Sequence, residues 1–262
     1  MKKSLTIHIG PMKTASTFFY DCCQLLPLGL TRRKETFYFS LFKRSNIGDF
    51  FSLFDRSCHD YVHIEPSYFS SLFALEGLKT FFPDAKIVIC LRNYESLLSS
   101  YLLHLYSLGK LSKSTIANVS ISEYPLIKPI DYSLFVPPWL ESFENVFFYS
   151  FSDFTSSLVS RKRILFNLFP FLKRDDFDLL AALPPSNVSR LYHPWLSPLR
   201  RLTPYINILP CSNGLLSLKS LIMKYTGQRR SLPSINVNQD LAFAYADKQI
   251  NFFGDYSNFN FL

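Results

Sequence analysis

The chain has 262 residues, of which 48% are hydrophobic and 17% aromatic, which is enough apolar material for one large core. We therefore expect a single α/β domain over residues 1–262. The 28 Lys and Arg outnumber the 20 Asp and Glu, and the net charge of +8 favours an anionic partner over a cationic one. Charge alone does not choose among a nucleotide, an acidic sugar, a membrane surface, nucleic acid and a merely solvated basic surface.

The cysteine content and the N-terminal segment bear on the cellular compartment. The five cysteines are odd in number and show neither C-x-x-C nor Cys/His zinc spacing, which argues against a disulfide framework and a zinc site. The start MKKSLTIHIG resembles a signal peptide, but Thr6 and His8 interrupt the apolar run and no cleavage site follows. No run approaches the ~18 apolar residues of a membrane helix, so we expect no transmembrane segment and a cytoplasmic location.

The rest of the chain is organised around residues 5–24. Apolar and polar residues alternate at its start, which predicts a strand. Gly10 and Pro11 predict a turn, and the residues after the turn predict a helix. The first N–H groups of a helix lack internal partners, and the turn adds a cation and hydroxyls, so an anion site is predicted, with an ordinary helix start as the alternative. The residues of this predicted site are Lys13, Thr14, Ala15, Ser16 and Thr17.

The turn does not match the usual phosphate-binding loop of ATP-binding proteins, which disfavours a nucleotide kinase. That motif is G-x-x-x-x-G-K-[ST], whereas Lys13 comes three residues after Gly10 with no second glycine before it. The segment instead resembles the phosphosulfate loop PK[TS]GTT of sulfotransferases, and its bacterial form HIGPxKTGTT more closely still. Ala15 replaces the glycine and adds a methyl group where the backbone approaches the ligand, while Ser16 keeps the hydroxyl of the first threonine.

Glu35 is the candidate general base. It follows a basic run and precedes the aromatic residues 37–39, which predict a strand or a buried edge. A carboxylate beside apolar surface can accept a proton, although a surface ion pair is the alternative. Lys34, Glu35 and Phe39 fit the K-E-x-x-x-F segment of heparan-type sulfotransferases, whose glutamate deprotonates the acceptor. The resemblance places Lys34 near the acceptor as well.

Glu65 ends a predicted strand over residues 61–65, ahead of a helix over residues 70–82. The string EPSYF resembles the E-(K)-SPxYF segment of the same family, which lies near the acceptor. Glu65 is thus a candidate substrate-binding residue, as an acid/base or orienting group, with a cap of the next helix as the alternative. His59 and His63 are interpreted as structural.

A second phosphate signal begins at the buried strand 87–91, whose end carries Arg92. Ser100 follows on a helix predicted for residues 95–108. The pattern resembles the family's 3′-phosphate signature, a strand ending in LRNP and then a serine on the helix, in which arginine and serine hold the phosphate. Tyr94 replaces the proline and Leu97 a frequent arginine.

Several weaker expectations complete the chain. His104 lies one turn beyond Ser100 and faces either the acceptor or the core. The Ser- and Pro-rich residues 111–138 are predicted to form an acceptor-covering loop. Residues 145–154 are predicted as a strand, followed by a helix over 160–172. Tyr149 and Phe151 are predicted to lie in the core, with stacking on the adenine of a nucleotide as the alternative. Arg229 and Arg230 are interpreted as an exposed basic turn, with contact to the 3′-phosphate as the alternative.

Together the motifs resemble a bacterial sulfotransferase, which implies a three-layer α/β fold with a central, mostly parallel sheet. The donor would be 3′-phosphoadenosine 5′-phosphosulfate (PAPS), the product 3′,5′-adenosine bisphosphate (PAP), and the acceptor a hydroxyl or amine of a glycan, lipid or small alcohol. Neither a metal nor nucleic acid is implied. A PAPS-site binding protein without turnover and a small-molecule kinase are the alternatives.

Overall fold

The computed structural model describes residues 4–40, 47–55, 58–183, 235 and 261–262, with the side chains of Ile121 and Ala182 left out. In this part of the chain five parallel strands form one sheet in the order β2-β3-β1-β4-β5. The strands are β1 (Ser4–His8), β2 (Gly29–Leu30), β3 (Asp60–Ile64), β4 (Lys86–Leu91) and β5 (Val146–Ser150). The last residues return to this sheet, where Phe261 forms a parallel bridge with Phe148.

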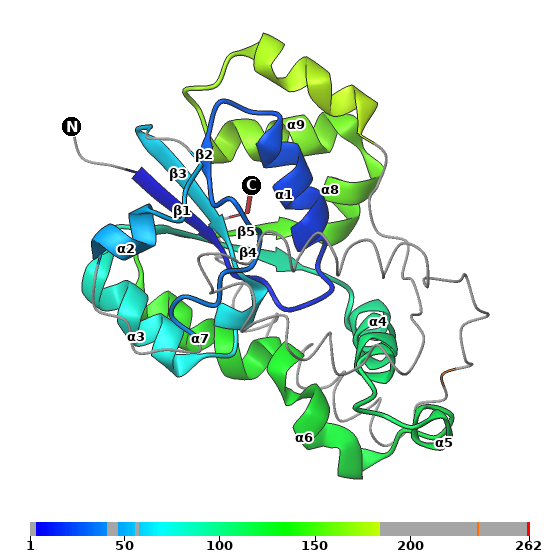
Figure 1. The fold of residues 1–262 in the computed structure, drawn as a ribbon. Coiled ribbons are helices and arrows are strands. Elements are labelled where there is room, and N and C mark those ends of the chain that lie inside the picture. The colour runs from blue at the N-terminus through cyan, green and yellow to red at the C-terminus, as the bar shows by residue number, and fades with distance from the viewer. Residues whose placement is uncertain (1–3, 41–46, 56–57, 184–234, 236–260) are drawn as a thin grey trace, which may run out of the picture.

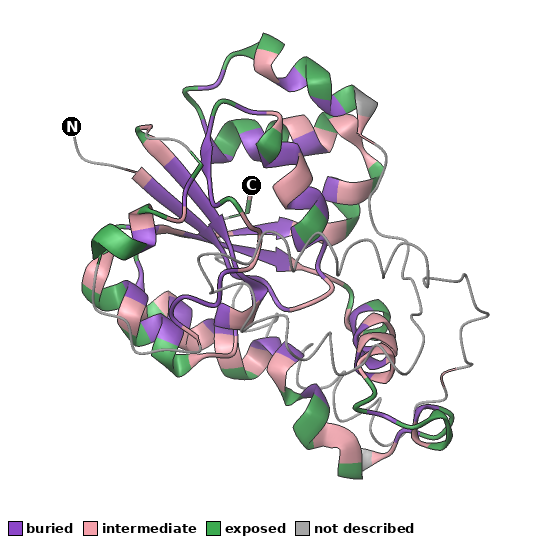
Figure 2. Cartoon of the chain, in the orientation of Figure 1, coloured by how far each residue is buried: buried purple, intermediate pink, exposed green. Residues whose placement is uncertain are grey.

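The sheet has an apolar core on each face because successive side chains of a strand point to opposite sides. Ile7, Ile87 and Ile89 belong to one core, whereas Val88 and Cys90, between and after them, belong to the other. The pairing of Ile7 with Ile87 in register keeps like faces together. Figure 2 shows the strands buried between helices whose outer surfaces are exposed.

Helices cover both faces and make three layers (Figure 1). One face carries α1 (Ser16–Gln24), α8 (Phe151–Ser156), α9 (Leu158–Leu168) and the 3-10 helix η4 (Arg174–Ala182). The other core is built with α2 (Ile47–Phe51), α3 (Leu72–Phe81), α4 (Tyr94–Ser107) and α7 (Tyr132–Ser142). The predicted three-layer α/β class with a parallel sheet is therefore confirmed.

Residues 111–138 are not the predicted loop. They form α5 (Lys113–Ile116), η2 (Ile121–Glu123), α6 (Tyr124–Ile127), η3 (Lys128–Ile130) and the first half of α7. Asp131 caps α7 by accepting a hydrogen bond from the N–H of Ser133. Tyr132, Val136 and Trp139 recur at helical spacing and are buried, and their packing outweighs the two prolines inside the helix.

Two other element predictions differ from the structure. Residues 36–39 form no strand but are buried, as the alternative of a buried edge predicted. The strand predicted to reach residue 154 ends at Ser150. Ser150 accepts a hydrogen bond from the N–H of Asp153, so α8 begins at once as a capped helix. No helix among the described residues is long and apolar enough to cross a membrane.

The strand order fixes where a ligand can bind. β1 lies between β3 and β4, and these strands are parallel to it. The chain forms β2 and β3 on one side of β1 and then β4 and β5 on the other side, which opens a crevice at the carboxyl ends of the strands beside β1. The segments after β1, β3, β4 and β5 all leave the sheet at this edge.

Candidate active site

The turn after β1 is held tightly against β4. Ile9 donates its N–H to the carbonyl of Val88 at 3.0 Å, and the hydroxyl of Thr14 donates to the carbonyl of Pro11 at 2.6 Å. A Cβ at Gly10 would lie 3.0 Å from the backbone nitrogen of Cys90, so a larger residue would push the turn away from β4. Gly10 therefore permits the close approach of the two segments.

The turn ends in an unusual backbone conformation. Lys13 has φ 75° and Ala15 has φ 59°, both in the left-handed region that L-residues rarely adopt. Ala15 is the N-cap of α1 and offers no side-chain cap, and the first turn of α1 carries no acidic residue. By contrast, Ser71 caps α3 and Asn93 caps α4 through their side chains. The positive end of α1 is therefore not neutralised by a capping side chain.

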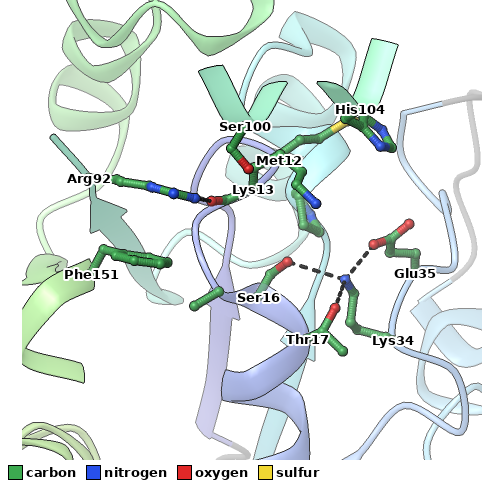
Figure 3. A pocket seen from close by; sticks show the side chains of 12 residues that line it. Met12, Lys13, Ser16, Thr17, Lys34, Glu35, Arg92, Ser100, His104 and Phe151 are labelled. Atoms are coloured by element: carbon green, nitrogen blue, oxygen red, sulfur yellow. Dashed lines mark hydrogen bonds and ion pairs between the residues drawn. The ribbon is translucent and has the colours of Figure 1, made fainter. Parts of the chain in front are cut away.

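Lys34 brings a second cation to the start of α1. Its ammonium group donates to the hydroxyls of Ser16 at 3.2 Å and Thr17 at 3.1 Å. The same Nζ lies 2.6 Å from Oε1 of Glu35, as the dashed lines in Figure 3 show. Lys34 therefore ties the predicted base to the predicted phosphosulfate loop, and Glu35 is ion-paired as well as exposed to the cavity.

Arg92 reaches the same loop from β4. Its Nη1 donates to the carbonyl of Lys13 at 2.6 Å and its Nε to the hydroxyl of Ser96 at 3.0 Å. The guanidinium carbon lies 4.2 Å from the centre of the Phe151 ring, a cation–π distance. Partial burial lowers the pKa of Arg92, but an arginine keeps its charge at any physiological pH. The guanidinium is thus held in place while it stays charged.

These segments enclose one cavity of about 370 Å³ (Figure 3). It brings together nine of the eleven residues that the sequence predicts for the site. The lining residues are Met12, Lys13, Ala15, Ser16, Thr17, Lys34, Glu35, Pro66, Arg92, Ser100, His104 and Phe151. The side chains of Lys13, Lys34 and Arg92 are positively charged, and Glu35 supplies the one carboxylate of this lining. The electrostatic potential of the cavity therefore favours a ligand with several negative charges.

Two predicted residues lie behind the cavity wall. Thr14 is fully buried and uses its hydroxyl to close the turn. Glu65 is also fully buried, and its carboxylate accepts hydrogen bonds from the N–H groups of Thr36 and Phe37 and from the hydroxyl of Ser67. The placement of Glu65 therefore gives no support to its predicted contact with substrate, because its oxygens are turned toward the protein.

His104 lies on the cavity, whereas His59 and His63 do not line it. His63 is buried with its ring against Phe50 and Tyr68. Residues 229 and 230, predicted as possible phosphate ligands, lie outside the described part of the chain.

Sequence reasoning missed Met12, Pro66, Ser96 and Phe151. Phe151 was predicted to lie in the core, but its ring lies on the cavity wall beside Arg92. The sequence could have indicated this position, because Phe151 directly follows β5 and so lies at the same edge of the sheet as Arg92. Ser96 stands one helical turn after Arg92, where a hydroxyl can reach the guanidinium.

The three residues that depart from the motifs are accommodated by the local structure. Leu97 has no exposed surface and packs in the core, so the arginine that is frequent at this position is replaced by a buried leucine. Tyr94 begins α4, and Asn93 still caps that helix by accepting from the N–H groups of Glu95 and Ser96. Ala15 keeps the left-handed conformation that the motif's glycine would adopt more easily.

Comparison with known proteins gives a match in structure but none in sequence. No protein-family model matches the chain, and no curated protein matches it by sequence. Among solved structures, the chain is similar to the crystal structure of a sulfotransferase from Alicyclobacillus acidocaldarius, with a TM-score of 0.53 and 17% identity. The match covers 85% of this chain and 96% of the other. At this identity the likeness concerns the fold, and the chain has the α/β fold of a sulfotransferase.

Proposed function

We propose that the protein is a sulfotransferase that moves the sulfuryl group of PAPS to a hydroxyl or amine of an acceptor. The observation that carries the proposal is the meeting of the β1 loop, Arg92 and Glu35 on one cavity at the carboxyl edge of the sheet. A cavity of about 370 Å³ is within the usual range of small-ligand sites. The fold shared with a sulfotransferase supports the same reaction class.

The donor side consists of two anion-binding regions. Lys13, Lys34 and the uncapped start of α1 suit the 5′-phosphosulfate. Arg92 and Ser100 suit the 3′-phosphate, and this second region would distinguish PAPS from ATP. The aromatic ring of Phe151 beside Arg92 offers an apolar surface at the same end of the cavity.

The reaction would be an in-line transfer. Glu35 takes the proton of the acceptor hydroxyl as that oxygen bonds to sulfur, and the bond from sulfur to the bridging oxygen breaks. The electron pair of the broken bond leaves on the 5′-phosphate of PAP. Lys13, with the hydroxyls of Ser16 and Thr17, stabilises the charge that grows on that phosphate. Positioning and electrostatics supply the catalysis.

The first test is PAP binding measured by calorimetry, with ATP for comparison. The Arg92→Ala change should weaken PAP binding by roughly 1.5 to 3 kcal/mol, the contribution of charged hydrogen bonds. Arg163→Ala is the matched control, because Arg163 is exposed on α9 and away from the cavity. Equal losses in both variants, or none in either, would remove Arg92 from the site.

The second test is transfer of labelled sulfate from PAPS to glycans, lipids and small alcohols. Transfer to one class would establish the activity and name the acceptor. PAP binding without transfer to any of them would favour the binding-protein alternative. Protection of the fold by ATP but not by PAP would favour a kinase.

A further inference from the structure

The segment that carries Glu35 is held by side chains instead of by the sheet. Residues 36–40 pass the end of β3 without forming a strand. Thr36 donates its N–H to Oε2 of Glu65 at 2.7 Å, and Phe37 donates its N–H to the same oxygen at 2.6 Å. Farther along, the N–H of Phe39 donates to the hydroxyl of Tyr68 at 3.2 Å. Glu65 therefore takes the two amides that directly follow Glu35.

Glu65 is itself rigidly anchored. It follows the last residue of β3, and its N–H donates to the carbonyl of His8 at 2.9 Å, which extends the pairing of β3 with β1. Its Oε1 accepts from the hydroxyl of Ser67 at 2.7 Å, and the residue has no exposed surface. A carboxylate fixed to the central strands is a firm support for an irregular segment.

The supported segment needs such a support. Phe37 has φ 55°, a left-handed conformation that is strained for a non-glycine residue. Two short hydrogen bonds to one buried carboxyl oxygen offset that strain. Burial raises the pKa of Glu65, and the charge of Glu35 raises it further, which fits two carboxyl groups that lie close together.

We propose that Glu65 is a positioning residue, which fixes Glu35 on the cavity wall by holding the amides of Thr36 and Phe37. The role that it positions for, proton removal from an acceptor, rests on the proposed function above. Glu65 does not touch substrate in this proposal, because its oxygens are taken by backbone and by Ser67.

Two substitutions separate the hydrogen-bond geometry from the presence of a titratable carboxyl group. In Glu65→Gln the amide oxygen can still accept both N–H groups and the amide nitrogen can donate to Ser67, so the geometry stays while the carboxyl group is lost. In Glu65→Asp the carboxyl group stays, but the side chain is one methylene shorter and cannot keep both hydrogen bonds. Tyr68→Phe is the control, since it removes a hydrogen bond to the same segment two residues farther from Glu35.

The experiment measures sulfate transfer, PAP affinity and hydrogen exchange of the Thr36 and Phe37 amides in these full-length variants. We expect turnover within about 3-fold of the parent for Glu65→Gln and Tyr68→Phe, and a loss of about 10-fold or more for Glu65→Asp, consistent with the sensitivity of catalysis to small misplacements. PAP affinity should be unchanged in all three. The two amides should exchange faster only in Glu65→Asp.

Several results would overturn the proposal. Greater loss of turnover in Glu65→Gln than in Glu65→Asp would show that turnover depends on the carboxyl group itself and not on the hydrogen bonds that hold the segment. Unchanged exchange of both amides in Glu65→Asp would show that Glu65 does not hold them. If the parent protein transfers no sulfate, the proposed function fails by itself, and the exchange rates still decide whether Glu65 supports the segment.

Discussion

At the scale of single residues, the two cations Lys13 and Arg92 are placed on the cavity in different ways. Arg92 is fixed by Lys13, Ser96 and Phe151, whereas the ammonium group of Lys13 faces the cavity with Glu35 and Lys34 (Figure 3). A fixed guanidinium suits a group that is only held, and a lysine beside the predicted base suits a group whose charge changes. Removal of Arg92 should therefore mainly lower ligand affinity, whereas removal of Lys13 should mainly lower turnover.

The Lys13→Ala change should lower kcat by about 10² while PAP affinity falls much less, because the lysine acts on charge that develops during transfer. Steady-state kinetics with PAPS and calorimetry with PAP measure the two quantities. Lys110→Ala, at an exposed position after α4, is the control for loss of a positive charge. A drop in PAP affinity with unaltered kcat would make Lys13 a binding residue only.

The Glu35→Gln change should cut turnover by roughly 10² to 10⁴, the usual contribution of a positioned general base. The swap is nearly isosteric, so PAP binding and the free energy of unfolding should change little. The amide oxygen can still accept a hydrogen bond from Lys34, which keeps the contact seen at 2.6 Å. Full activity of Glu35→Gln at every pH would show that Glu35 is only the ion-pair partner of Lys34 and not the general base. His104, which also lines the cavity, would then be the next candidate for the base.

At the scale of elements, the β1 turn stores strain at Ala15. The left-handed conformation costs an alanine roughly 1 to 2 kcal/mol, and glycine would avoid this cost. Glycine would in turn lose about 0.5 to 1 kcal/mol of stability, because it has more conformational entropy than alanine in the unfolded chain. Ala15→Gly should therefore stabilise the fold by about 1 kcal/mol in urea denaturation. Ala117, exposed at the end of α5 with φ −74°, is the matched control, and Ala117→Gly should destabilise. Destabilisation by both changes would show that the turn is not strained at Ala15.

The elements also show what the sequence could and could not predict. Short-range signals sufficed for the β1 turn and for Arg92, because a run of apolar residues and the turn after it are local features. They failed for residues 111–138, where the buried stripe of α7 outweighs its prolines. They also failed for Glu65, since the amides that it holds lie about thirty residues earlier in the chain.

At the scale of the whole molecule, buried titratable groups set the response to pH. Burial lowers the pKa of His8 to about 3, with the charge of Lys34 adding to this, and burial lowers the pKa of His63 to about 3 as well. Neither Nδ1 has a hydrogen-bond partner among the described residues, so a proton there would be a buried, unsatisfied donor. Both histidines are therefore neutral in the folded protein.

The sign of their effect follows from linkage. Between about pH 3 and 6.5 the unfolded chain binds protons that the folded protein refuses, so stability falls as the pH falls. Glu65 acts in the opposite sense, because its pKa is raised from 4.5 to about 8 and the folded protein keeps a proton that the unfolded chain loses. Its contribution is full below about pH 4.5 and is lost as the pH rises through 8.

The free energy of unfolding should therefore be highest near pH 6.5. Below that value the two histidines outweigh Glu65, and above it Glu65 acts alone, with a slope of up to about 1.4 kcal/mol per pH unit. Urea denaturation of Glu65→Gln at pH 5 to 8.5 isolates this limb, because the variant cannot titrate there. The decline above pH 6.5 should disappear, and the decline toward acid should become steeper. A Glu65→Gln profile that still falls above pH 6.5 would mean that another group causes the decline and that Glu65 is ionised throughout.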